Sequence, residues 1–360
     1  MPLAESKFYH RVAELIQQGQ AFKVCRVVHA VGSAPRNAGA QMVVLPDGKI
    51  EFTLGGGAIE GRVIREAVLS MDDPGAMLRE YHLGDLGMHC GGIMQVMFES
   101  AQAQDLAFYR QAASLMDQRA SFISAYDLNE NQPHLAKAIF SESSKPFGDE
   151  VFIEKAEASA KELWASDSMY LQKADHFVNK VFPSLRLLIF GAGHVGAKLA
   201  EVAAASSVFT VDIVDDRTEF ADEAKLPFCD HVLVAPHNYE GGLPLPDERT
   251  FVAVITRCHD TDKVVLKTLL NSEKPFAYLG MIGSVPKRAQ LFKLLKDEGV
   301  SETKLDQVVT PMGLPIGGKE PGEIAVSMLA EMIQRKNQLD GTLEGGIVRW
   351  KRKQQAELNV

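Results

Sequence analysis

Hydrophobic positions in the first hundred residues change from helical to strand-like spacing. Phe8, Val12, Leu15 and Ile16 recur at the interval that lines one helical face, which predicts a helix over Ser6–Gln18. Valine-rich runs follow, and Pro46-Asp47-Gly48 is typical of a turn between two of them. The predicted strands span Lys23–Ala30, Gln41–Leu45, Lys49–Leu54 and Ile93–Glu99. We therefore expect a small mixed α/β unit that contains a hairpin.

A glycine run in this unit leads into a second predicted helix. Gly55, Gly56 and Gly57 precede a segment in which Ile59, Val63 and Ala67 share one face. Backbone N–H groups at a helix start, assisted by the helix dipole, can bind a phosphate. The alternative is a flexible turn without a ligand.

A polar loop between two predicted strands supplies further candidate ligands. Ser33, Pro35, Arg36 and Asn37 lie in it, and an arginine can pair bidentately with a phosphate. An arginine taken alone is more often a solvated surface charge. We favour binding because both loops belong to the same small unit.

The middle of the chain gives weaker patterns. Residues 101–180 contain a predicted helix near Gln104–Asp117 and strand-like pieces at Ser121–Tyr126 and Glu150–Ile153. A new pattern begins after Phe182-Pro183-Ser184. We therefore place one domain at residues 1–182, a second at 183–340, and a polar tail at 341–360.

The second domain opens with a strand, a glycine loop and a helix in direct succession. The strand from Arg186 ends in GAGHVG, in which Gly191 permits a tight turn, Gly193 allows a pyrophosphate to approach, and Gly196 allows close helix packing. A second strand then delivers Asp215 at the spacing of a residue that hydrogen-bonds a ribose hydroxyl. This arrangement is typical of a dinucleotide-binding Rossmann fold.

Strands and helices continue to alternate, which predicts a parallel sheet. The strands are His231–Ala235, Phe251–Ile255 and Phe276–Gly280, the intervening helices include Asp262–Leu270 and Lys287–Leu295, and the last helix opens at Pro321. The fold class is thus an N-terminal mixed α/β domain followed by a Rossmann-like, doubly wound parallel-sheet domain.

Ligands bind beyond the carboxyl ends of such strands. The residues expected there are Thr256, His259, Asp262, Gly280, Gly283 and Ser284. His259 and Asp262 can form an acid/base pair or share a metal, but a hydrogen bond that stabilises the loop is the commoner role of such a pair.

Composition narrows the class of protein. The formal net charge of -9, with no basic stripe, disfavours nucleic acid. We see no export signal and no apolar run of membrane-spanning length, so we expect a cytoplasmic protein that does not contact membranes. The four cysteines, Cys25, Cys90, Cys229 and Cys258, are scattered, which favours reduced thiols over disulfides or a zinc site.

Seven motifs together resemble one family. They are VGSAPRNAGAQMVV, GGGAIEG, GMHCGG, IFGAGHVGAKLAEVAA, VDDRTEF, LGMIGSVPKR and PMGLPIGGKEPGEIAVSMLAE. Their order is similar to that of the XdhC/CoxI family of molybdoenzyme accessory proteins, over about Val24–Glu99 and Leu187–Ile333. Met312 and Pro315 depart from the family pattern, as does the insertion of Arg257-Cys258 before His259.

The resemblance implies a cofactor chaperone rather than a catalyst. Such proteins bind molybdenum cofactor (molybdopterin), shield it while its sulfido ligand is installed, and pass it to xanthine dehydrogenase or a related molybdenum hydroxylase. The expected partners are therefore that enzyme and a cysteine desulfurase. A homodimer is expected on general frequency alone.

Cys90 is the residue we expect to bind the metal. A thiolate is a good ligand for a soft metal centre, and Gly91 and Gly92 allow a bulky ligand to approach. The alternative is that Cys90 packs in the interior, as free cysteines often do. We expect Cys25 and Cys229 to be core residues, and Cys258 is a second candidate.

The expected dinucleotide-side residues are Gly191, Gly193, His194, Gly196, Asp215 and Arg217. His194 can face a phosphate or cap the helix. The ligand there can be NAD or a pterin dinucleotide, and an NAD-dependent oxidoreductase is the alternative function, with Asp215 repelling the 2′-phosphate of NADP. A scaffold that only recognises a partner is a third possibility. The cofactor-chaperone hypothesis requires that three features face one cleft: the glycine pocket before the helix that begins near Ala58, the glycine pocket before the helix after Gly196, and the sulfur of Cys90.

Overall fold

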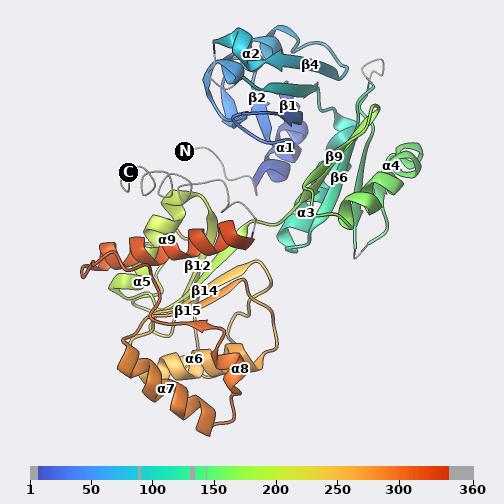
Figure 1. The fold of residues 1–360 in the computed structure, drawn as a ribbon. Helices are drawn as coiled ribbons and strands as arrows, with labels where there is room; N and C mark the ends of the chain where they lie inside the picture. The colour runs from blue at the N-terminus through green and yellow to red at the C-terminus, as the bar shows by residue number, and fades with distance from the viewer. Residues whose placement is uncertain (1–6, 88–90, 130–133, 143, 340–360) are drawn as a thin grey trace, which may run out of the picture. The chain divides into compact units, whose positions relative to one another are not determined.

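A computed structural model of the chain describes residues 7–87, 91–129, 134–142 and 144–339. The chain divides into two compact units, residues 1–183 and 184–360 (Figure 1). The first unit contains two five-stranded sheets, and the second contains one six-stranded sheet.

The first sheet is antiparallel and has the order β3-β2-β1-β5-β4. Its strands are β1 (Lys23–Val31), β2 (Gln41–Val44), β3 (Ile50–Phe52), β4 (Met77–His82) and β5 (Ile93–Glu99), and its helices are α1 (Phe8–Gln17) and α2 (Gly57–Leu69). The predicted hairpin is confirmed, because Met42 pairs with Phe52 and the Leu45 N–H donates to the Lys49 carbonyl at 2.9 Å. Strand β4 was not predicted.

The second sheet is also antiparallel, with the order β8-β7-β6-β10-β9. Its strands are β6 (Phe122–Asp127), β7 (Lys137–Ser141), β8 (Phe147–Gly148), β9 (Tyr170–Gln172) and β10 (His176–Val181), and its helices are α3 (Leu106–Asp117) and α4 (Glu150–Trp164). The strand predicted at Glu150–Ile153 is wrong. That segment is the first turn of α4, where Asp149 accepts a hydrogen bond from the Phe152 N–H at 2.8 Å.

Helices α1 and α3 share one apolar core with both sheets of the first unit. Phe8 of α1 and Phe108 of α3 belong to the same buried cluster as Val24 of the first sheet and Phe177 of the second. Helix α2 covers the opposite face of the first sheet, and α4 that of the second. Two short 3-10 helices, η2 (Leu83–Leu86) and η3 (Ala103–Asp105), connect these elements.

Four buried charges lie where the two sheets of the first unit meet. Lys137 of β7 pairs with Glu99 of β5 at 2.9 Å and also with Asp105. Arg26 of β1 lies 3.4 Å from Glu99, and its guanidinium stacks 3.5 Å above the ring of Tyr126. Buried charges are tolerated only when they are paired, so this cluster joins the two sheets in one arrangement.

The second unit is a parallel sheet with the order β13-β12-β11-β14-β15-β16. Its strands are β11 (Leu185–Phe190), β12 (Phe209–Asp215), β13 (His231–Val234), β14 (Thr250–Val254), β15 (Tyr278–Met281) and β16 (Val308–Val309). Its helices are α5 (His194–Ser206), α6 (His259–Asn271), α7 (Val285–Asp297), α8 (Glu302–Leu305), α9 (Pro321–Leu339) and the 3-10 turn η4 (His237–Tyr239).

Helices cover both faces of this sheet (Figure 1). Helices α5 and α9 contribute to one apolar cluster, and α6, α7 and α8 to the other. The strand order reverses direction between β11 and β14, which is the position where open α/β sheets bind ligands. The predicted fold class is confirmed. Among the described helices, none is long and apolar enough to cross a membrane.

Candidate cofactor-binding site

Each glycine of the GAGHVG loop has a distinct steric environment. Gly191 has a φ of +114°, and a Cβ there would lie 2.1 Å from the Ile255 carbonyl oxygen. A Cβ on Gly196 would lie 1.9 Å from the Gly191 oxygen, so helix α5 packs too closely for any side chain. At Gly193 a Cβ would meet nothing within 4 Å. Two glycines thus allow close packing, and the third leaves open space in front of the helix.

The start of α5 retains its capacity to bind an anion. The N-cap Gly193 offers no side-chain acceptor, and the first turn contains no acidic residue. His194 is the first helical residue and is exposed. The first N–H groups of a helix have no partner within the helix and carry partial positive charge. A phosphate is a suitable acceptor for them.

The spacing predicts that Asp215 hydrogen-bonds a ribose, but in the structure its carboxylate is bound by groups of the chain itself. It is completely buried, and its carboxylate accepts hydrogen bonds from the Ala192 N–H at 2.7 Å and from Arg217 Nε and Nη2 at 2.9 Å each. Burial disfavours ionisation, but the hydrogen bonds from Arg217 and Ala192 outweigh it and lower the pKa of Asp215. Both oxygens therefore hold the glycine loop and Arg217 in place.

Arginine side chains neutralise both acids at the end of β12. Arg217 pairs with Asp215 and lies 3.8 Å above the Phe220 ring, and Arg257 pairs with Asp216. The predicted repulsion of a 2′-phosphate by Asp215 therefore does not follow, because that charge is already compensated within the loop.

Asp262 stabilises the loop after β14. Its Oδ1 accepts hydrogen bonds from Thr256 Oγ1 at 2.6 Å and from the Thr256 N–H at 3.2 Å, whereas His259 Nδ1 lies 3.9 Å from Oδ2. The hydrogen bond predicted between His259 and Asp262 is therefore not formed, and Asp262 stabilises the loop through Thr256 instead. Burial raises the pKa of Asp262 to about 6.

Gly280 was predicted to lie beyond the carboxyl ends of the strands, where ligands bind, but the structure places it elsewhere. It lies buried within β15, where a Cβ would be 2.5 Å from Met312 Sδ. Gly283 and Ser284 do lie at the end of this strand, and Ser284 is the N-cap of α7. The predicted group therefore assembles without Gly280.

The glycine loops of the first unit converge at one end of its first sheet. A Cβ on Gly55 would lie 2.6 Å from Pro35 Cβ and 3.0 Å from Arg36 Cγ. A Cβ on Gly92 would lie 2.5 Å from the Val31 oxygen and 2.7 Å from the Ser33 oxygen. Three motifs far apart in the sequence are thus in direct contact. Gly91 is exposed, and the neighbouring Cys90 lies outside the described residues.

A carboxylate of the chain occupies part of the Gly55-Gly56-Gly57 turn. Glu60 Oε2 accepts hydrogen bonds from Thr53 Oγ1 at 2.5 Å, from the Leu54 N–H at 2.9 Å and from the Gly56 N–H at 3.2 Å. The Gly55 N–H donates to Thr53 Oγ1 at 3.0 Å. A phosphate would have to displace Glu60 to reach these donors. The sequence signal for this role is an acidic residue in the first turn of α2, and it was missed.

Arg36 is a cation beside these converging loops. It is exposed, and no ion pair of the described residues involves it. Its side chain can therefore reach a phosphate without breaking an existing interaction.

The three described cysteines differ in reactivity. Cys25 is buried, and burial raises the pKa of its thiol. Burial, with Asp230 and Asp212 nearby, raises the pKa of half-buried Cys229 to about 12. Cys258 is exposed at the N-cap of α6, and hydrogen bonding from Thr261 lowers its pKa. Within the described residues no group of three His, Cys, Asp or Glu side chains is placed to hold a metal ion.

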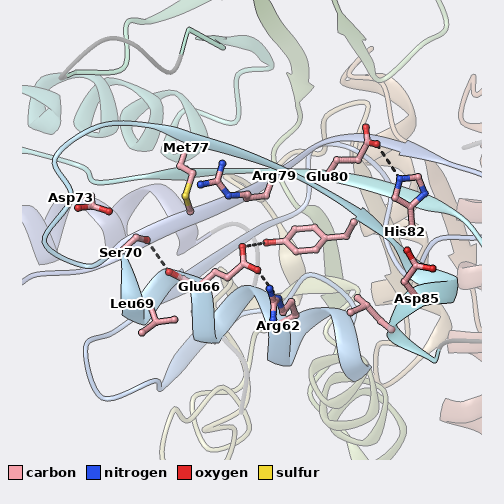
Figure 2. Close-up of a pocket in the computed structure, with 12 residues that line it drawn as sticks. Arg62, Glu66, Leu69, Ser70, Asp73, Met77, Arg79, Glu80, His82 and Asp85 are labelled. Carbon is pink, nitrogen blue, oxygen red and sulfur yellow. Dashed lines mark hydrogen bonds and ion pairs between the residues drawn. The ribbon is translucent and has the colours of Figure 1, made fainter.

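A groove of about 680 Å³ lies between α2 and β4 (Figure 2). Its charged side chains are largely paired with one another. Glu66 accepts hydrogen bonds from Tyr81 Oη at 2.7 Å and from Arg62 Nε at 2.6 Å, and His82 lies 3.3 Å from Glu80. The sequence pattern gave no sign of this groove, and none of the predicted site residues that the structure describes lines it.

The fold and its glycine loops define a two-unit α/β protein with a Rossmann sheet. An XdhC Rossmann domain model matches residues 187–332, and a model of the XdhC and CoxI family matches residues 15–82. The two matches together cover more than half of the chain. The chain belongs to the XdhC/CoxI family.

Three curated relatives are similar over most of the chain. The uncharacterized protein YqeB of Escherichia coli is 25% identical over 93% of this chain, which spans only 47% of that relative. A Bacillus subtilis relative, named as a probable xanthine dehydrogenase subunit, is 23% identical over 92% of this chain and 98% of its own. The E. coli molybdenum cofactor insertion chaperone PaoD is 23% identical over 89% of this chain and 85% of its own.

One solved structure has the same fold. A crystal structure described as a xanthine dehydrogenase from Bacillus halodurans matches with a TM-score of 0.74. The match covers 93% of this chain and 96% of that one, at 22% identity. It supports the fold of each unit.

Proposed function

We propose that this protein binds molybdenum cofactor and inserts it into xanthine dehydrogenase or a related molybdenum hydroxylase. It would shield the cofactor during sulfuration by a cysteine desulfurase, and act as a cytoplasmic homodimer. The name of the similar insertion chaperone supports the cofactor, and the name of the B. subtilis relative supports the target enzyme. The chain spans about half of the length of YqeB.

One observation carries the proposal: three glycine-bearing loops meet at one end of the first sheet. The loops of residues 31–37, 55–57 and 91–92 approach closely at Gly55 and Gly92, with Arg36 exposed beside them. A pterin phosphate needs cationic and N–H donors, and a bulky metal centre needs approach without side chains. Arg36 supplies the cationic donor and the glycines the space, whereas the N–H donors of the Gly55-Gly56-Gly57 turn become available only when Glu60 is displaced.

Three groups would hold the cofactor. Arg36 and the Ser33 hydroxyl would contact the phosphate, Gly91 and Gly92 would leave room for the pterin, and Cys90 would bind the metal through its thiolate. When bound, the group supplies a molybdenum centre that carries an exchangeable sulfido ligand. The chain itself binds, orients and shields that centre.

The test is cofactor stoichiometry in protein purified from cells that make molybdenum cofactor. We expect molybdenum and pterin to be bound by the wild-type chain, molybdenum to be lost on Cys90→Ala, and both to fall about tenfold on Arg36→Gln, because one charge-assisted phosphate contact is removed. Metal analysis and pterin fluorescence measure the two parts separately.

Arg65→Gln is the matched control, since Arg65 is an exposed arginine of α2 outside the converging loops. Unchanged molybdenum content in Cys90→Ala would remove that thiol from the site. Equal loss of pterin in the Arg36 and Arg65 variants would show that only general charge matters, and would contradict the proposed site.

A dinucleotide is the second candidate ligand, with an NAD-dependent oxidoreductase as the alternative function. The open space at Gly193 before α5 favours it. Titration with NAD and with a pterin dinucleotide, monitored by calorimetry, separates the two ligands. A Cβ at Gly193 would meet no atom within 4 Å beyond the adjoining backbone, so Gly193→Leu should fold normally and block either ligand. If neither ligand binds to the wild-type protein, the dinucleotide hypothesis is wrong.

A further inference from the structure

Three neighbouring strands of the second unit end beside one another. The Ile282 N–H donates to the Val254 carbonyl at 3.0 Å, and the Met312 N–H donates to the Met281 carbonyl at 3.2 Å. The segments that follow β14, β15 and β16 are therefore held together at the carboxyl edge of the sheet. This edge is where parallel sheets place their ligands.

Thr310 presents a buried hydroxyl group at this edge without a hydrogen-bond partner. The residue is 7% exposed, and its Oγ1 has no partner among the described residues. A Cβ built on Gly283 would lie 3.8 Å from this oxygen, so the hydroxyl faces the backbone just before α7. An unsatisfied buried hydroxyl destabilises a protein, and such a group requires an explanation.

The first turn of α7 carries positive charge where a helix normally avoids it. Its N-cap, Ser284, makes no capping side-chain hydrogen bond, and the turn contains no acidic residue. Lys287 and Arg288 lie there instead, although the helix dipole disfavours cations at this end. Arg288 packs 5.0 Å from the Phe292 ring, and the ion pairs of the described chain involve neither cation.

These two observations are independent, and both concern the start of α7: the Thr310 hydroxyl lies beside Gly283, and Lys287 lies in the first turn of the helix. We propose that the start of α7, the Lys287 ammonium group and the Thr310 hydroxyl form a phosphate-binding site that is separate from the GAGHVG loop. Pro286 has no N–H, so the donors available there are the Val285 and Lys287 N–H groups, the Lys287 ammonium group and the Thr310 hydroxyl, and a phosphate supplies acceptor oxygens and negative charge. A free phosphate and a phosphate monoester share this chemistry.

The Asp262 carboxylate and a bound phosphate would both attract the Lys287 ammonium group. The two side chains are close enough for Lys287 to favour the ionised form of the carboxyl. A phosphate would compete with the Asp262 carboxylate for the same ammonium group. Removing the carboxylate charge with Asp262→Asn should therefore tighten phosphate binding.

The experiment titrates the full chain with inorganic phosphate and with ribose 5-phosphate by calorimetry, at constant ionic strength. We expect Lys287→Gln to weaken binding about tenfold, and Thr310→Val to weaken it roughly fivefold, from the usual strengths of charged and neutral hydrogen bonds. Tighter binding of ribose 5-phosphate identifies a monoester as the ligand, and tighter binding of inorganic phosphate identifies the free anion. Either result supports the site if Lys287→Gln weakens it.

Two controls separate this site from general effects. Lys293→Gln removes an exposed cation further along α7 and should leave the affinity unchanged. Thr310→Val should raise the Tm of the ligand-free protein while it lowers the affinity, because a methyl group replaces an unsatisfied hydroxyl. A purely structural hydroxyl would instead give a lower Tm with unchanged affinity.

The proposal is overturned if phosphate binds equally to the wild-type, Lys287→Gln and Thr310→Val chains, or if no phosphate binds. Gly193→Leu blocks the approach to α5, so binding that this variant abolishes belongs to the glycine loop and also contradicts the proposal. None of these measurements involves molybdenum. Failure here therefore leaves the cofactor stoichiometry of the proposed function untouched.

Discussion

Asp262 is a carboxyl group that the fold removes from water, and its burial raises its pKa from 3.8 to about 6. Folding therefore favours the protonated form. The resulting stabilisation is fully present below about pH 4 and is lost as the pH rises through 6, which corresponds to about 3 kcal/mol for a shift of about two pKa units.

We expect Asp262→Asn to abolish the fall in the free energy of unfolding that accompanies ionisation of Asp262. The amide oxygen of asparagine carries no charge and can still accept the Thr256 hydrogen bonds. The variant should unfold at a higher urea concentration than the wild type at pH 7.5, with a difference of up to about 3 kcal/mol that nearly disappears at pH 4. Asp260→Asn, in the same helical turn but exposed, is the control. A constant difference across this pH range would contradict the prediction.

Single residues of the site were predictable where local geometry alone sets their role. Gly191 and Gly196 are examples, because a strand, a glycine loop and a helix in succession leave no room for a Cβ at these positions. Asp215 was not predictable in the same way. Its spacing suggested a ribose partner, but the folded chain brings the Ala192 N–H and Arg217 to its carboxylate. The Thr310 hydroxyl was missed because its burial depends on packing between distant segments.

Secondary-structure elements were predictable where apolar spacing is strong. Strand β5 was predicted to the residue, and the strands and helices of the second unit follow their hydrophobic pattern. Helix α4 was missed because Val151, Phe152 and Ile153 together have high strand propensity. The buried positions Phe152, Ala156 and Leu163 show that helical spacing was present over the longer window.

The cap of α4 provides a test at this scale. Asp149 Oδ1 accepts the hydrogen bond from the Phe152 N–H, so we expect Asp149→Ala to lower the free energy of unfolding by about 1 kcal/mol. Urea denaturation followed by circular dichroism measures this change. Glu154→Ala replaces an exposed residue of the same helix with a better helix former and should not destabilise the protein. Equal effects of the two substitutions would mean that the cap contributes nothing.

Across the whole molecule, the second unit was more predictable than the first. Alternating strands and helices with short connections specify a parallel sheet almost directly. In the first unit, β1 pairs with β5, and two antiparallel sheets share a core with α1 and α3. Such pairings between distant segments leave little trace in local periodicity. The contact between the loops at Gly55 and Gly92 depends on them, so the sequence identified those motifs without placing them together.

The buried charges of the first unit should make its stability depend on Lys137. This side chain is 2% exposed and lies between Glu99 and Asp105, so Lys137→Met would leave two buried carboxylates with fewer partners. We expect a loss of about 3–5 kcal/mol, as is usual when one partner of a buried ion pair is removed. Lys161→Met, which removes an exposed pair with Glu157 on α4, should cost less than about 1 kcal/mol.

Hydrogen exchange measured peptide by peptide locates the effect of Lys137→Met within the molecule. Amides of β6 and β7 should lose protection in this variant, whereas those of β11 and β12 should keep theirs, because the paired charges belong to the first unit alone. Uniform loss of protection in both units would show that they unfold as one. Unchanged protection would show that the cluster does not hold the two sheets of the first unit together.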